Sequence, residues 1–276
     1  MLELSLCNEL LAEDGLSLAA QCERAAALGY RGLELAPGTL SARPHAMSGA
    51  EWRAVRETVE AAGLRVTGLH WLLSPYPGLS IFDPATHAET QAVLGGLIDG
   101  CAALGGDVLV HGSPPSRRRP DGMSPEAALD MAADFFAPVA ERAAAAGVAY
   151  CIEPLSPVET NFAGTLAEAV ALVERVGNPA FRTMIDSSAA AQAEALPVAD
   201  LIRAHVPTGQ IAHVQLNESN RGAPGMGTDP FGEIVRALID VGWDRPVAIE
   251  PFRTCIDGTV TAAIGYATIR AHEARP

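Results

Sequence analysis

The chain has 276 residues, of which 49% are hydrophobic and 19% charged, with 33 acidic residues against 19 basic ones. This apolar content excludes disorder for most of the chain, and the net charge of −14 argues against nucleic-acid and membrane partners. Every basic residue is Arg, which excludes enzymes that depend on a lysine, such as Schiff-base aldolases, pyridoxal enzymes and Walker-type nucleotidases.

Short apolar runs alternate with Ala-rich segments from end to end of the sequence. Several runs are continuously apolar, which is typical of strands buried on both faces. The predicted strands are residues 2–8, 32–36, 66–73, 107–112, 149–155, 182–187, 211–217 and 246–252. The segments between them repeat apolar residues at intervals of three and four, which predicts helices. The predicted helices include residues 16–28, 50–62, 85–104, 124–146, 165–176 and 229–241.

Each of these helices is followed directly by a glycine, which is typical of a C-terminal cap. Eight strand–loop–helix repeats in about 250 residues predict an α/β fold, a single (β/α)8 TIM barrel over residues 1–276. A doubly wound sheet is the alternative, but its usual GxGxxG motif is missing after the first strand.

Three features of the sequence bear on location. The longest uncharged stretch, residues 66–82, contains prolines and is too short to span a membrane. The five cysteines include no CxxC pair, and the N-terminus lacks the positive region of a signal peptide. We therefore expect a reduced, cytoplasmic protein with no membrane attachment.

Acidic side chains end three of the predicted strands. Glu153 and Glu250 are each followed by a proline that ends the strand, and Asp186 closes an apolar run. Gln215 lies on the strand between the last two acids. Because active-site groups in such barrels project from the carboxyl ends of the strands, we expect these side chains to converge.

Converging carboxylates repel one another by about 4 kcal/mol per pair at ~4 Å and an effective dielectric constant of ~20. The arginine run at 117–119 is predicted to lie in a solvated loop, so a divalent cation is the simplest compensation. Carboxylates with an amide oxygen favour Mn²⁺ or Mg²⁺. We expect Mn²⁺ first, with Mg²⁺, Co²⁺ or Zn²⁺ as alternatives, and metal-assisted proton transfer as the chemistry.

Three histidines and a tryptophan also fall on the predicted strands. His70, Trp71 and His111 end the third and fourth strands, where they are candidates to bind substrate hydroxyls, with Trp71 stacking on a sugar. His213 shares a strand face with Gln215 and is a candidate to support that ligand or contact substrate. The alternative for each histidine is a hydrogen-bonded core residue.

These residues together resemble the xylose-isomerase-like TIM barrels, which include ketose 3-epimerases and hydroxypyruvate isomerases. The segment CIEPLSPVE at 151–159 resembles the epimerase segment in which Glu153 binds metal and transfers a proton and Glu159 contacts substrate. Asp186 and Glu250 match the metal aspartate and the second catalytic glutamate. HVQLNESNR at 213–221 resembles the segment whose Arg221 touches substrate oxygens.

The sequence departs from this pattern at two positions. Gln215 replaces the usual metal-binding histidine, as in hydroxypyruvate isomerase-like members, where the amide oxygen binds the metal. Ala189 stands where the ketose epimerases have a substrate-binding histidine. The resemblance therefore implies a sugar isomerase or epimerase without naming the sugar, and a homo-oligomer, either a dimer or a tetramer.

The resulting hypothesis is a metal-dependent sugar isomerase or epimerase that acts on a ketose, an aldose or a small keto-hydroxy acid. Glu153 and Glu250 would exchange a proton through an enediolate. A lyase or dehydratase acting on a keto-sugar or keto-inositol is the alternative, since it shares the first step. The negative charge argues against a third reading, an apurinic-site endonuclease. The three intact acids argue against a fourth, a non-catalytic sugar-binding barrel.

Overall fold

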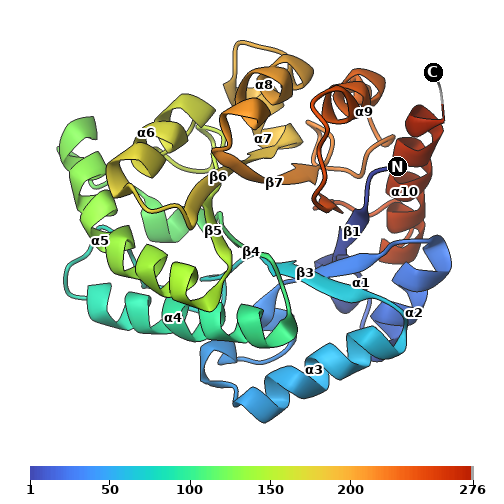
Figure 1. Ribbon diagram of the computed structural model, residues 1–276, viewed down its shortest axis with the longest axis horizontal. Coiled ribbons are helices and arrows are strands. Elements are labelled where there is room, and N and C mark those ends of the chain that lie inside the picture. The colour runs from blue at the N-terminus through green and yellow to red at the C-terminus, as the bar shows by residue number, and fades with distance from the viewer. Residues whose placement is uncertain (275–276) are drawn as a thin grey trace.

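The computed structural model describes residues 1–274, and these form a closed barrel of eight parallel strands paired in sequence order, with helices around it (Figure 1). The predicted (β/α)8 fold is confirmed. The strands are β1 Leu4–Cys7, β2 Gly32–Leu35, β3 Arg65–Leu69, β4 Val108–His111, β5 Ala149–Ile152, β6 Phe181–Asp186, β7 Ile211–Leu216 and β8 Val247–Ile249. Each lies within or overlaps a predicted strand, and most are shorter than predicted because the barrel ladder ends before the apolar run does.

Ten α-helices connect or flank the strands. They are α1 Glu9–Glu13, α2 Leu18–Leu28, α3 Gly49–Ala61, α4 His87–Leu104, α5 Pro125–Ala146, α6 Leu166–Val176, α7 Ser187–Ala193, α8 Val198–His205, α9 Phe231–Asp240 and α10 Gly258–Glu273, within the described 1–274. The six predicted helices are present as α2 to α6 and α9. Local capping fixes several starts: the Ser48 side chain accepts from the Glu51 backbone N–H and Glu51 reaches back to Ser48, a reciprocal capping box.

The apolar core has two separate parts. The larger part lies between the strands and the helices, where Tyr150 of β5 packs against Phe136 of α5. The smaller part consists of residues from four consecutive strands: Val108, Val110, Cys151, Met184 and Ala212. Because alternate residues of a strand point to opposite faces, these side chains fill the barrel interior while Tyr150 points outward.

The same alternation places the acids at the carboxyl end of the interior. Cys151 and Met184 each precede an acid by two positions, so Glu153 and Asp186 point inward above them. Asp186 pairs directly with Gln215 across β6 and β7. The barrel thus brings residues from distant parts of the sequence to one end of the interior.

No helix within residues 1–274 is both long and apolar enough to cross a membrane.

Candidate active site

Three carboxylates meet at the carboxyl end of the barrel. Glu153, Asp186 and Glu250 follow or end β5, β6 and β8, and each offers an oxygen atom such that the three oxygens lie within 4.8 Å of one another. All three side chains are buried. The sequence therefore predicted their convergence, and the barrel supplies it.

Burial raises the proton affinity of this triad. Burial first, and then the charge of Asp186, raises the pKa of Glu153 well above its usual range. Burial and then the charge of Glu153 do the same to the pKa of Glu250, and burial raises the pKa of Asp186 to about 6. A group of buried acids of this kind needs a positive charge to remain ionised.

Gln215 is buried on β7, where it pairs with Asp186 of the triad across β6 and β7. Its Nε2 donates a hydrogen bond of 2.8 Å to Glu34 Oε1. The Oε1 atom of Gln215 itself is buried and has no hydrogen-bond partner among the described residues. Asp186 Oδ2 and Glu250 Oε2 are also buried and unpartnered. These orphaned oxygens and the all-oxygen donor set of Glu153, Asp186, Gln215 and Glu250 fit a hard divalent cation.

Glu34, which the sequence analysis did not identify, holds this amide in place. It is fully buried in β2, and His213 Nε2 lies 2.8 Å from its Oε2. Burial alone would raise the pKa of Glu34, but His213 and then His70 hold it below its usual range. The sequence feature that could have identified Glu34 is its position as a carboxylate inside the otherwise apolar strand GLEL. His213 thus contacts Glu34, the carboxylate that holds the Gln215 amide.

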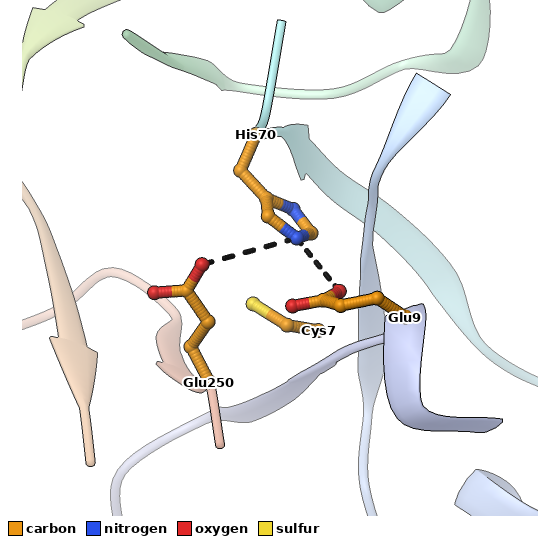
Figure 2. Close-up of side chains that lie close together, drawn as sticks. All are labelled: Cys7, Glu9, His70 and Glu250. Atoms are coloured by element: carbon orange, nitrogen blue, oxygen red, sulfur yellow. Dashed lines mark hydrogen bonds and ion pairs between the residues drawn. The ribbon is translucent and has the colours of Figure 1, made fainter. Parts of the chain in front are cut away.

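His70 is buried in a second group of side chains (Figure 2). Its Nε2 lies 2.7 Å from Glu9 Oε2 and 4.0 Å from Glu250 Oε1, and its Nδ1 lies 3.6 Å from Glu34 Oε1. Burial alone would lower the pKa of His70, but Glu9 raises it above its usual value. Glu9 lies in the short α1, and no sequence pattern pointed to it.

His111 is also fully buried, and its Nδ1 lies 2.6 Å from the Tyr150 hydroxyl. Burial and then the charge of Arg117 lower the pKa of His111 to about 3, so the imidazole is neutral at physiological pH.

A cavity of about 540 Å³, here called the mouth cavity, reaches Glu153 and Glu250 of the triad and lies between the loops that follow β3, β4, β5, β7 and β8. Its lining includes five of the predicted site residues: Trp71, Glu153, Glu159, Arg221 and Glu250. The other three predicted substrate contacts, His70, His111 and His213, are outside this lining and contact protein groups instead.

One wall of the mouth cavity combines aromatic and charged groups. Trp71 stacks on Phe252 with ring centroids 6.0 Å apart, and the Arg221 guanidinium lies 4.0 Å over the same Phe252 ring. Arg221 Nη1 also donates to Glu159 Oε1 at 2.8 Å. Trp71 and Arg221 both have positive φ angles, of 54° and 68°, an uncommon conformation for side-chain-bearing residues that occurs more often at functional sites.

Arg117 departs from the sequence-based expectation. The run at 117–119 was predicted to be solvated, which is wrong for Arg117: its side chain is fully buried, because the 3-10 turn Pro114–Arg117 folds it inward. Its three guanidinium nitrogens have no hydrogen-bond partner among the described residues. Its charge opposes the effect of burial on the pKa of Glu153.

Comparison with known proteins identifies relatives of the chain. The D-psicose 3-epimerase of Agrobacterium fabrum is 37% identical over 106 residues, covering 38% of this chain and 36% of that protein. The ketose 3-epimerase of Arthrobacter globiformis is 27% identical over 189 residues, covering 67% of this chain and 63% of that protein. The chain therefore aligns with about a third to just under two thirds of the length of these curated relatives.

Solved structures share the fold over nearly the whole chain. An L-ribulose 3-epimerase matches with a TM-score of 0.80 and 21% identity, covering 99% of this chain and 94% of that one. A 3-keto-D-glucoside 4-epimerase from E. coli matches with a TM-score of 0.80 and 17% identity, covering 98% and 100%. The family model for the xylose isomerase-like TIM barrel matches residues 22–271. The chain belongs to the xylose isomerase-like TIM barrel family.

Proposed function

We propose that this protein is a divalent-metal-dependent sugar epimerase or isomerase in which Glu153 and Glu250 transfer the proton. One observation carries the proposal: three buried carboxylates from separate strands place oxygens within 4.8 Å of one another at the carboxyl end of the barrel. The names of the aligned relatives, which are ketose and D-psicose 3-epimerases, support the same reaction class.

Glu153, Asp186, Gln215 and Glu250 would hold the cation. When bound, a divalent ion polarises a carbonyl and its neighbouring hydroxyl, so that the C–H bond between them becomes acidic. Manganese is our first expectation, because all four donors are oxygen atoms, with Mg²⁺, Co²⁺ and Zn²⁺ as alternatives.

The two glutamates then do the proton chemistry. One carboxylate removes the proton from the acidified carbon to give an enediolate, and the other returns a proton to it. Both belong to the lining of the mouth cavity, so both reach a substrate bound there. Positioned general acids and bases of this kind contribute about 10²- to 10⁴-fold each.

The mouth cavity suits a small carbohydrate. Its volume of about 540 Å³ is in the range of small-molecule sites. Trp71 and Phe252 offer an apolar face, while Glu159 and Arg221 offer charged hydrogen-bonding groups to hydroxyls. A ketose, an aldose or a small keto-hydroxy acid presents this combination of surfaces.

The test is a screen of ketoses, keto acids and 3-keto-glycosides with the metal-supplemented protein in deuterated water. We expect deuterium at one carbon of a product whose mass is otherwise unchanged, which also separates an epimerase from the lyase alternative. Absence of exchange in every substrate class would contradict the proposal. No feature of the described site favours the lyase.

The expected homo-oligomer and the cytoplasmic location remain predictions. Light scattering of the purified chain tests the first of them.

A further inference from the structure

We propose that Cys7, Glu9, His70 and Glu250 form a second divalent-cation site next to the triad, selective for a softer ion such as Zn²⁺. The inference goes beyond the proposed function and does not require the epimerase reaction, although the two sites share Glu250.

The four side chains come from three parts of the barrel. Cys7 ends β1 and Glu9 begins α1, while His70 and Glu250 directly follow β3 and β8. Each is buried, and each offers one donor atom such that all four donors lie within 4.8 Å of one another. In Figure 2 the thiol, the imidazole and the two carboxylates converge on one space. In a tetrahedral site with donors about 2.0–2.3 Å from zinc, the donor atoms lie about 3.3–3.8 Å apart, so donors of this group that lie near the 4.8 Å limit would have to approach by about 1 Å.

An unpartnered oxygen in the same group indicates that a ligand completes it. Glu9 Oε1 is buried with no hydrogen-bond partner among the described residues, and Glu250 turns its other oxygen, Oε1, toward His70. A buried acceptor left in this state costs about 1–3 kcal/mol, and more when it is charged. The hydrogen bond from His70 goes to the other oxygen of Glu9, Oε2, and leaves Oε1 without a partner among the described residues.

The second ring nitrogen of His70, Nδ1, lies near Glu34 without being hydrogen-bonded to it. Metal-binding histidines nearly always direct their second ring nitrogen at a carboxylate or carbonyl, which fixes the tautomer and the ring orientation. Here Nε2 faces the group of donors, and Nδ1 lies 3.6 Å from Glu34 Oε1. Ligation through Nε2 would replace its contact with Glu9 Oε2, and a small approach of Nδ1 to Glu34 would supply the hydrogen bond that fixes the tautomer.

The donor types predict the ion. A thiolate and an imidazole favour Zn²⁺ over Mg²⁺ and Mn²⁺, whereas the triad with Gln215 offers oxygen alone. Two carboxylates with one Cys and one His supply the four ligands of a closed tetrahedral zinc site. Ligation requires the Cys7 thiol to lose its proton, so uptake of the ion releases protons to solvent.

Cobalt(II) is the probe for the experiment, because it replaces zinc and absorbs in the near ultraviolet when a thiolate binds it. The full chain is stripped with a chelator and titrated with Co²⁺ alone. We expect two ions per chain in the wild type and a thiolate-to-cobalt band. The variant Cys7→Ser should lose the band and one ion, and Asp186→Asn should lose one ion and keep the band.

Two cysteine variants serve as matched controls. Cys22→Ser changes another buried thiol and Cys255→Ser changes the one partly exposed thiol, and both should keep the band and both ions. If Cys7→Ser fails to fold by circular dichroism, Glu9→Gln replaces it. That variant keeps the thiol and should weaken cobalt binding at the band-forming site at least about tenfold.

One ion per wild-type chain with no thiolate band would overturn the proposal and would leave His70 and Glu9 as a simple ion pair. A band that survives in Cys7→Ser would overturn it as well. Because metal counting needs no substrate, a chain that binds two ions but exchanges no deuterium would contradict the proposed function alone.

Discussion

The two ends of the barrel interior differ in what their side chains contact. Toward the amino end, Val108, Val110, Cys151, Met184 and Ala212 form a buried apolar cluster. At the carboxyl end, the same strands and their neighbours present buried acids, several with oxygens that have no partner within residues 1–274. The transition takes two residues, from Met184 to Asp186 on β6.

This difference shows how one scaffold separates stability from function. Apolar contacts at the amino end stabilise the barrel without any ligand, whereas buried unpartnered carboxylates at the carboxyl end oppose folding unless a positive charge offsets them. Variants on either side of the transition should therefore change different measurements.

The largest effect is expected for Glu153→Gln. Removal of a positioned acid–base group should slow deuterium exchange by about 10²- to 10⁴-fold, while circular dichroism stays as in the wild type. Proton NMR of the reaction in deuterated water measures the rate. The exposed Glu141→Gln on α5 is the matched control and should exchange at the wild-type rate. Near-normal exchange in Glu153→Gln would show that another residue moves the proton.

On the amino-end side, Met184→Ala should lower the free energy of unfolding by about 2–5 kcal/mol, because it leaves a cavity in a fully buried cluster. Urea denaturation measures this loss. The number of ions bound per folded chain should remain that of the wild type. A loss of metal with unchanged stability would erase the distinction between the two ends.

On the carboxyl-end side, Asp186→Asn should raise the free energy of unfolding of the metal-free protein, whereas Met184→Ala lowers it. Burial raises the pKa of Asp186 to about 6 from an ordinary 3.8, and each unit of this shift represents about 1.4 kcal/mol against the charged form. In chelator at pH 7, the variant should therefore need more urea to unfold than the wild type does. Its free energy of unfolding should be higher by up to about 3 kcal/mol. Asn can still accept the hydrogen bond that Asp186 takes from the Ala189 N–H to cap α7.

The pH dependence of this gain sharpens the test. The folded chain holds the Asp186 proton more tightly than the unfolded chain does, so the metal-free wild type loses this contribution as the pH rises from about 3.8 to about 6. The advantage of Asp186→Asn should grow across that window and level off above it. An advantage that is the same at pH 4 and pH 7 would be inconsistent with a raised pKa.

The smallest effect on stability is expected for Arg221→Gln, at the edge of the mouth cavity. Its side chain is 41% exposed, so loss of the 2.8 Å ion pair with Glu159 should cost less than about 1 kcal/mol of stability. If Arg221 binds substrate, KM should rise about tenfold while kcat changes little. Steady-state kinetics on the substrate found in the screen measures both. An unchanged KM would remove Arg221 from the proposed substrate contacts.

The sequence by itself determined the barrel and the three strand-end acids. Continuous apolar runs, cap glycines and the prolines after Glu153 and Glu250 are local features, and alternation along a strand places each acid on the inner face. The same alternation along a strand identified Gln215 as a candidate ligand. It also placed His70, His111 and His213 on strands, but it could not predict which side chains they would contact.

Only the tertiary structure decided the partners of these side chains. Barrel closure pairs β1 with β8, which brings Cys7 and Glu9 to Glu250 across more than two hundred residues of sequence, and the pairing of β1 with β2 and of β2 with β3 brings them near His70. A turn buries Arg117, although its sequence reads as a solvated loop. Such contacts depend on the closure of the whole sheet and on loop conformation, which no local window of sequence contains.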